Sequence, residues 1–259
     1  MSYMYGCDGN SSAACDGKSA AFYGGEIGSY RGILSGTGNC GGTSGTYEGP
    51  CPGFGGCCFD ASTADVANLN YGTFGYYFIG GPSVDPSWDP STYTETDAYS
   101  WGQKQGEATL DYVEGKGFKW SEYLTVAEVY ADIESPVGSY GWLPLSDTYN
   151  GVTGEALNHE VFDGWYNAVN GHTTTNLGTM TAGIYSSPDA WSGAMGTKSL
   201  SGVPIWPYEA QVGCQCPTNM DDAEGFGGGT IKYWQYGQGC GSSSAEDWGY
   251  GRDPIANWR

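Results

Sequence analysis

The fold of this chain is decided by one stretch, Val126-Ala127-Glu128-Val129-Tyr130-Ala131-Asp132-Ile133-Glu134, which Pro136 follows closely. The stretch is largely apolar and strand-like, and the proline stops the strand. Side chains two residues apart on a strand point to the same side, so Asp132 and Glu134 face the same way. At the carboxyl end of a barrel strand, that side is the mouth, where barrel enzymes build their active sites. Taken alone, such a pair also suits a solvated turn.

The half-buried setting of Asp132 and Glu134 has a chemical consequence. Two neighbouring carboxylates repel each other, and desolvation further disfavours ionising both. We therefore expect the pKa of one of them to be raised. A raised carboxyl pKa is what a general acid for glycosidic cleavage requires.

From about residue 57 onward, short apolar runs alternate with amphipathic stretches, which is the pattern of repeated β/α units. Helical spacing is seen over residues 96–115 and 158–170. Strands are expected over residues 75–81, 124–133, 179–186, 203–210 and 230–236, with a turn at Pro188 after one of them. The sequence therefore predicts an α/β fold, a TIM-like (β/α) barrel over residues 57–259.

Residues 1–56 differ in character from the rest, because they are rich in Gly, Ser and Cys and show no helical periodicity. Such a segment buries little apolar surface, so we expect a disulfide-stapled N-terminal extension lying on the barrel or on a neighbouring subunit. The cysteines form no zinc-type pair of CxxC units, which favours disulfides in an oxidising compartment. Their number is odd, so at least one is free or intermolecular: Cys7, Cys15, Cys40, Cys51, Cys57, Cys58, Cys214, Cys216 and Cys240.

The composition excludes several classes of partner. With 9 Lys+Arg against 29 Asp+Glu, the net charge is −20, and a nucleic-acid partner is disfavoured because basic residues must neutralise phosphates. No apolar stretch approaches the roughly 20 residues needed to span a bilayer. We expect no cofactor and no resident metal. The loop from Asp85 to Asp89, with Asp97 nearby, offers carboxylates for calcium, but its spacing matches no known calcium loop.

Four short motifs, in order, resemble the lysozymes of glycoside hydrolase family 25. Phe59-Asp60-Ala61-Ser62 is similar to the first-strand motif of that family, and Tyr130-Ala131-Asp132-Ile133-Glu134 to its fourth-strand DxE. Gly183-Ile184-Tyr185-Ser186, followed by Trp191, resembles a later strand. Tyr233-Trp234-Gln235-Tyr236, with Asp253 and Asn257 downstream, resembles the closing segment. The motifs span about 200 residues of the chain.

The resemblance implies cleavage of the β-1,4 bond between N-acetylmuramic acid and N-acetylglucosamine in peptidoglycan or a related amino-sugar polymer. Glu134 would be the general acid, and Asp132 would orient the 2-acetamido group of the substrate as an internal nucleophile. Asp60 would bind the sugar or tune the pair. Asp253 is a candidate binding residue, although the family spacing is shorter and Pro254 is a departure. Aromatic residues near expected strand ends are further candidates for the cleft: Tyr185, Trp206, Trp234 and Tyr236.

A second hypothesis is an extracellular structural or assembly protein, such as a filament, sheath or coat subunit built on a non-catalytic hydrolase-like barrel. The odd cysteine, the Gly-rich N-terminal arm and the abundant Tyr and Trp suit contacts between subunits, and the arm would allow a homo-polymer to form. A third is a non-catalytic carbohydrate binder. All three place the protein outside the cell or on its surface.

Overall fold

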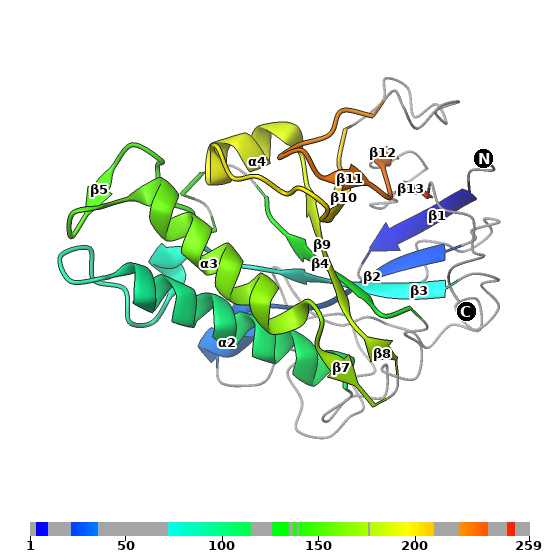
Figure 1. Ribbon diagram of the computed structural model, residues 1–259, viewed down its shortest axis with the longest axis horizontal. Coiled ribbons are helices and arrows are strands. Elements are labelled where there is room, and N and C mark those ends of the chain that lie inside the picture. The colour runs from blue at the N-terminus through cyan, green and yellow to red at the C-terminus, as the bar shows by residue number, and fades with distance from the viewer. Residues whose placement is uncertain are drawn as a thin grey trace.

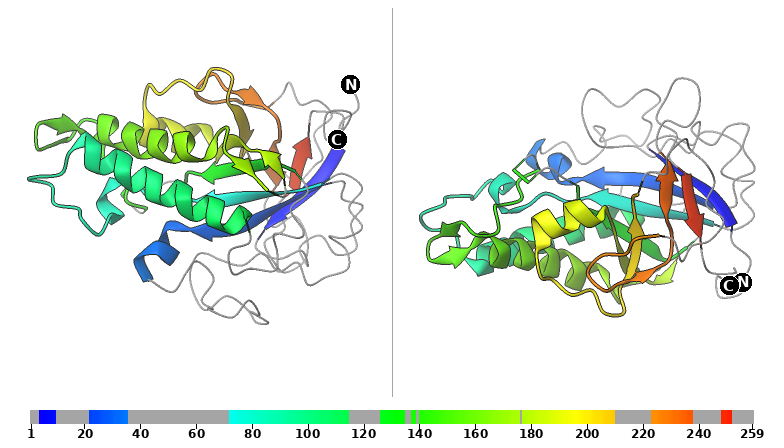
Figure 2. Two further views of the ribbon diagram at one scale, coloured as in Figure 1. Left: turned by 60° about the horizontal axis from the view of Figure 1, so that its bottom comes forward. Right: turned by 90° about the horizontal axis from the view of Figure 1, so that it is seen from above.

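The computed structural model describes residues 4–9, 22–35, 72–114, 126–134, 137–138, 140–175, 177–209, 223–237 and 248–251. These residues form a central sheet with a layer of helices on one side (Figures 1 and 2). The helices are α1 (Tyr30–Ser35), α2 (Glu95–Val113), α3 (Gly154–Val169) and α4 (Pro188–Met195), with a short 3-10 helix at Pro82–Val84. No helix of this described part is both long and apolar enough to cross a membrane.

The central sheet has nine strands in the order β11-β10-β9-β4-β3-β2-β1-β13-β12. Neighbours from β11 through to β1 are parallel, whereas β13 is antiparallel to both β1 and β12. The strands are β1 (Met4–Gly9), β2 (Phe22–Ser29), β3 (Gly72–Phe78), β4 (Glu128–Asp132), β9 (Thr181–Ser186), β10 (Pro204–Pro207), β11 (Thr230–Ile231), β12 (Gln235–Gly237) and β13 (Trp248–Gly251). Two small hairpins lie outside the sheet, β5 (Thr148–Tyr149) with β6 (Val152–Thr153) and β7 (Thr173–Thr174) with β8 (Gly178–Thr179). The expected α/β fold with a mostly parallel sheet is confirmed.

Two strands of the sheet come from the segment expected to be an extension. β1 and β2 lie within residues 1–56, and β2 pairs with both β1 and β3. A Cβ added to Gly24 would lie 2.8 Å from Trp206 Cη2 and 3.0 Å from Phe74 Cε2. Glycine on β2 thus leaves room for large rings of other strands, and this is why the strand lacks an apolar alternation of its own.

Two helix starts also differ from expectation. Pro188, expected in a turn, lies in the first turn of α4, where its missing N–H costs nothing. The Ser187 hydroxyl caps this helix by accepting from Ala190 N at 3.0 Å. Thr153 caps α3 in the same way, with Ala156 N donating at 3.2 Å, so α3 begins before the expected residue 158. Local capping therefore sets both boundaries.

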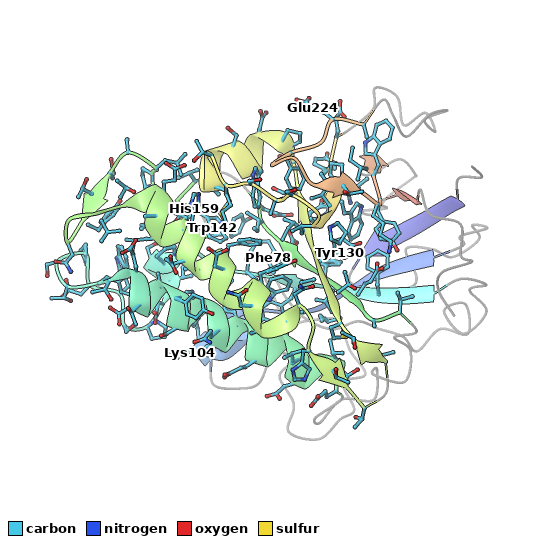
Figure 3. The ribbon with its side chains drawn as sticks, viewed as in Figure 1. Phe78, Lys104, Tyr130, Trp142, His159 and Glu224 are labelled. Atoms are coloured by element: carbon cyan, nitrogen blue, oxygen red, sulfur yellow. The ribbon has the colours of Figure 1, made fainter. Side chains whose placement is uncertain are left out.

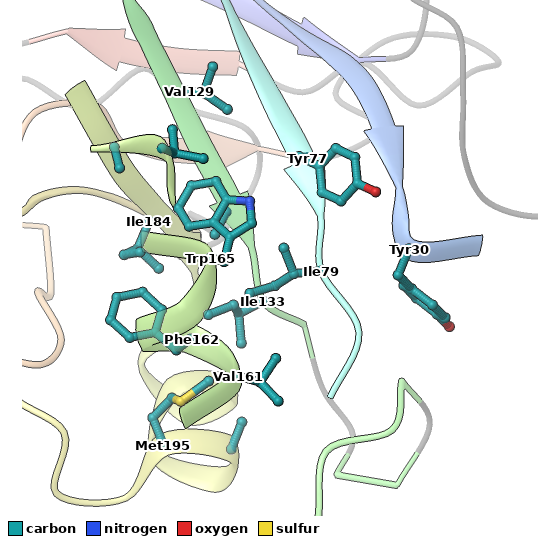
Figure 4. Packing of buried hydrophobic residues seen from close by; sticks show 14 of the residues in the cluster. Tyr30, Tyr77, Ile79, Val129, Ile133, Val161, Phe162, Trp165, Ile184 and Met195 are labelled. Carbon is teal, nitrogen blue, oxygen red and sulfur yellow. The ribbon is translucent and has the colours of Figure 1, made fainter. Parts of the chain in front are cut away.

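The two faces of the sheet are packed differently. On the helix-covered face, alternate residues such as Val129, Ala131 and Ile133 of the β4 region pack with α3, and Figure 4 shows Ile133 beside Ile79 and Val161. On the opposite face, a cluster of large buried rings fills the space in front of the strands: Phe74, Tyr130, Trp206 and Tyr233. We call the second face the inner face. The period-two alternation of strands therefore gives each face its own core: the helix-side core mixes aliphatic and aromatic residues, and the buried members of the inner-face core are all aromatic.

The helix layer depends on small residues where α2 and α3 cross. A Cβ on Gly102 would lie 2.0 Å from the Val161 carbonyl oxygen, and one on Gly164 would lie 2.1 Å from the Tyr99 carbonyl oxygen. The two backbones are thus closer than any larger residue allows. Beneath them, Trp165 Nε1 donates to Thr109 Oγ1 at 3.0 Å, so these two buried polar atoms are hydrogen-bonded to each other.

Candidate active site

A row of inner-face residues crosses the carboxyl ends of four neighbouring strands. Phe78 on β3 pairs in register with Asp132 on β4. Asp132 also pairs with Tyr185 on β9, and Tyr185 pairs with Trp206 on β10. Register partners on parallel strands share a face, so the Asp132 carboxylate lies between Phe78 and Tyr185. Asp132 is only 4% exposed. The sheet therefore places a buried carboxylate between two aromatic side chains.

Glu134 follows Asp132 two residues along the chain. The Ile133 amide donates to Tyr185 O at 3.0 Å, and Ser186 Oγ donates to Ile133 O at 2.7 Å, so the backbone stays paired with β9 beyond the last residue of β4. Ile133 packs into the helix-side core and is fully buried. Asp132, the last residue of β4, alternates with Ile133 and so faces away from the helices. Glu134 lies just beyond the strand, and its sharing of that face stays a prediction from the two-residue spacing.

Burial raises the pKa of the Glu134 carboxyl above its ordinary value. The shift is caused by desolvation, which disfavours the charged form. A protonated carboxyl at the edge of a sheet, two residues from a second carboxylate, has the chemistry of a proton donor.

Aromatic residues surround the pair on the β9 and β10 side. Tyr185 donates a hydrogen bond from its hydroxyl to the Gln235 side-chain oxygen. Its ring lies 4.9 Å from that of Trp206 and 6.4 Å from that of Tyr76, measured between centroids. Trp206 and Trp234, both predicted cleft residues, are 0% exposed. Trp206 thus packs against the half-buried Tyr185, Trp234 Nε1 donates to Glu209 O at 3.3 Å, and neither tryptophan offers an open ring face.

On the β3 side, the half-buried rings of Phe78 and Tyr140 meet edge to face with centroids 4.8 Å apart. Sequence reasoning missed both as site residues. Phe78 was taken as one of several residues of a buried strand, and its place beside Asp132 depends on the pairing of β3 with β4. Tyr140 lies in the turn that follows the acidic pair, and no spacing rule singles it out.

The amino end of the inner face holds another carboxylate, Glu128. Lys232 forms an ion pair with Glu128, and the hydroxyls of Tyr130 and Tyr233 donate to its other oxygen at 3.3 and 3.4 Å. Burial and the negative charge of Glu128 raise the pKa of Tyr130 well above its ordinary value, so this phenol stays protonated. Figure 3 labels Tyr130, which lies in the aromatic cluster between the two carboxylate sites.

Several predicted residues lie outside the described part of the chain. These are Asp60, Asp253 and every cysteine except Cys7, whose backbone lies in β1. Tyr236 is in β12, but its side chain is not described. The sheet thus brings together Asp132, Tyr185 and Trp206 from the predicted set, and Glu134 follows Asp132 two residues along the chain.

The acidic loop considered for calcium uses its carboxylates in local hydrogen bonds. Asp85 accepts from Ser87 N at 2.9 Å and from the Tyr93 hydroxyl at 2.7 Å. Asp89 accepts from Ser91 N at 2.9 Å, and Asp97 accepts from Thr94 N at 2.9 Å. Among the described residues, no group of three or more His, Cys, Asp or Glu side chains could hold a metal ion.

The fold defines a class of protein before any relative is considered: an α/β protein with a mostly parallel sheet and a carboxylate pair at the carboxyl ends of its strands. Comparison with solved structures shows that the fold is similar to that of a muramidase. A muramidase from Acremonium alcalophilum superposes with a TM-score of 0.50 at 15% identity, covering 98% of this chain and 96% of that chain.

Two further solved structures are similar over nearly the whole chain. The family GH25 lysozyme from Aspergillus fumigatus has a TM-score of 0.47 at 13% identity, covering 98% of this chain and 95% of that one. The bacterial lysozyme from Streptomyces coelicolor has a TM-score of 0.45 at 15% identity, covering 100% and 96%. No family model matches the sequence, and no curated protein matches it significantly. The resemblance expected from the motifs is therefore confirmed for the fold.

Proposed function

We propose that this protein is a glycoside hydrolase that cleaves β-1,4 linkages of peptidoglycan or a related amino-sugar polymer. The observation that supports the proposal is the position of Asp132 at the carboxyl end of β4, with Glu134 two residues further along the chain and its pKa raised by burial. The likeness of the fold to that of lysozymes and muramidases supports this choice of substrate class.

In the proposed reaction Glu134 is the general acid. Its proton passes to the glycosidic oxygen as the bond from that oxygen to the anomeric carbon breaks. The carbonyl oxygen of the 2-acetamido group of the substrate attacks the anomeric carbon, and Asp132 holds the acetamido N–H and stabilises the positive charge of the ring that forms. Water then attacks the anomeric carbon, gives its proton to the Glu134 carboxylate and reopens the ring. The product keeps its configuration, and Glu134 regains the proton that it donated.

The remaining roles follow the same scheme. Tyr185 flanks Asp132 and would contact the sugar, whereas Trp206 and Trp234 would support it from behind. Asp60, Tyr236 and Asp253 remain candidates for binding the polymer. We further infer that the sheet closes into a barrel, because Tyr208, just after β10, bridges to Gln235 of β12 and thereby links the strand next to one end of the order with the strand at the other end. Cross-linked cysteines and an extracellular or cell-surface location suit a polymer of the cell wall.

The decisive experiment compares the wild-type protein with Glu134→Gln and a matched control, Glu107→Gln, on purified peptidoglycan and on chitin-like oligomers. Glu107 is an exposed residue of α2, so the control makes the same chemical change on the helix layer. We expect new reducing ends from the wild type and the control and at least about 100-fold fewer from Glu134→Gln, the usual effect of removing a general acid. An inactive wild type, or an active Glu134→Gln, would overturn the proposal. An inactive wild type that forms large polymers would favour the assembly protein instead.

A further inference from the structure

We propose that Phe78 and Tyr140 form an aromatic wall that binds one sugar unit of the polymer beside Asp132. The proposal rests on the proposed function for the class of ligand, an amino-sugar polymer. It adds a binding surface on the β3 side of the carboxylate pair, opposite Tyr185.

The first step is the position of Phe78. Its register pairing with Asp132 puts the two residues side by side on neighbouring strands, and at this end of β3 its ring also packs against the helix-side core. The ring of Tyr30, which is 4% exposed, lies behind it with the two centroids 6.0 Å apart. Phe78 is therefore held from one side, and its neighbour on the sheet is the carboxylate that the reaction uses.

The second step is the fixed position of Tyr140. The Gly81 amide donates to Tyr140 O at 2.9 Å, and the Ser83 amide and hydroxyl both donate to Gly141 O at 3.1 Å. A Cβ on Gly81 would lie 2.4 Å from Gly141 O, so the two turns touch through their backbones. The turn that carries Tyr140 is thereby fastened to the turn that follows β3, and its ring meets Phe78 without further ordering.

The turn that follows β3 is also hydrogen-bonded to the helix layer. Gln105 of α2 forms two hydrogen bonds with Gly80, accepting from its amide at 2.7 Å and donating to its carbonyl at 2.9 Å. Trp101 Nε1 donates to the carbonyls of Gly80 and Gly81 at 3.0 and 3.1 Å. A pre-ordered surface loses little conformational entropy on binding, which favours a ligand site over a mobile surface turn.

The third step is exposure. Two other inner-face rings, Phe74 nearer the amino end of β3 and Trp206 on β10, are 0% exposed and fill space. Phe78 and Tyr140 are half-buried, so each residue keeps some solvent-accessible surface for a ligand. An open, rigid aromatic surface next to polar groups is the usual composition of a small-molecule site. The apolar face of a pyranose ring, or the methyl of its acetamido group, fits such a surface.

The test uses Tyr140→Ala and Tyr140→Phe, with Tyr166→Ala as the matched control. Tyr166 is a half-buried tyrosine of α3 whose ring also has one aromatic partner, Phe162, with centroids 5.7 Å apart. Binding of chitin-like tetramers and of soluble peptidoglycan fragments is measured by calorimetry in the Glu134→Gln background, which prevents turnover. KM and kcat are then measured in the active background, and thermal unfolding is followed for each variant.

We expect Tyr140→Ala to weaken binding and raise KM about tenfold, a change of about 1.4 kcal/mol, with kcat nearly unchanged. Tyr140→Phe should restore binding because it keeps the ring, and Tyr166→Ala should bind as the parent does. A merely structural role would lower the melting temperature and kcat without a selective rise in KM. Unchanged binding by Tyr140→Ala, or no binding of either glycan by the parent, would contradict the proposal of an aromatic wall. If binding depends on Tyr140 but the protein does not hydrolyse the glycan, the aromatic wall is supported and the proposed hydrolase activity is rejected.

Discussion

The two ends of β4 carry carboxylates in contrasting environments. At the amino end, Glu128 is neutralised by Lys232 and accepts from two tyrosine hydroxyls. At the carboxyl end, Glu134 has no ion pair with any described residue, and burial raises its pKa. One carboxylate thus has a cationic partner, and the other, just beyond the strand, is the one that we propose as the general acid. The difference teaches that the partners of a buried acid, more than its burial, decide which role it plays.

The largest expected effect is a difference in kcat between substitutions at the two ends of β4. Glu134→Gln should lower kcat by about 100- to 10,000-fold, because it removes the proton donor, whereas Glu128→Gln should leave the kcat of the folded protein within a few-fold. Initial rates of reducing-end release, corrected for the folded fraction by circular dichroism, measure both. Equal losses in the two variants would remove the distinction between the ends.

The next effect is on the free energy of unfolding, and it is expected at the amino end of β4. Lys232→Met leaves Glu128 buried without its cation, and we expect the free energy of unfolding to fall by about 2–3 kcal/mol. This value is near the lower end of the cost of breaking a buried ion pair, because Lys232 is partly exposed. The double variant Glu128→Gln with Lys232→Met should regain most of this loss. Urea unfolding provides the measurement, and a single variant as stable as the wild type would show that the ion pair is not structural.

A smaller effect is expected at Gln235, which accepts from the Tyr185 hydroxyl at the carboxyl end. Gln235→Leu should cost about 1 kcal/mol of stability and raise KM a few-fold, since Tyr185 loses the partner that orients its ring. Gln235→Glu keeps an acceptor and serves as the control. If both variants behave alike, the hydrogen bond does not position Tyr185.

The smallest effect is the pH dependence of stability due to Glu134. Its pKa is higher in the folded than in the unfolded protein, so the folded state binds more protons between the two values and loses stability as pH rises through the folded pKa. Glu134→Gln should therefore unfold at a slightly higher temperature than the wild type at neutral pH, and the difference should vanish at low pH. A difference that grows on acidification would contradict the sign of the shift.

The carboxyl end of β4 was predictable from sequence, and the amino end was not. Asp132 and Glu134 could be found because a two-residue spacing before Pro136 fixes their common face, and the surrounding apolar run implies burial. The ion pair of Glu128 joins residues 104 positions apart, so it depends on the fold bringing β4 beside the segment after β11. No local pattern encodes such a contact.

Strands built on glycine were also hard to predict. β2 has Gly24 where the rings of Phe74 and Trp206 need space, so its apolar contribution comes from other strands. Hydrophobic periodicity measures only the side chains that a strand itself carries. The strands β3, β4 and β9, which carry their own apolar residues, lie close to the expected ranges.

The pH dependence of kcat/KM on peptidoglycan, for the wild type and Glu134→Gln, tests the catalytic assignment most directly. If Glu134 is the buried general acid, the wild-type rate falls with rising pH only above the ordinary range of a glutamate, and the residual activity of Glu134→Gln lacks this limb. A Glu134→Gln variant that keeps the wild-type rate and profile would contradict the assignment.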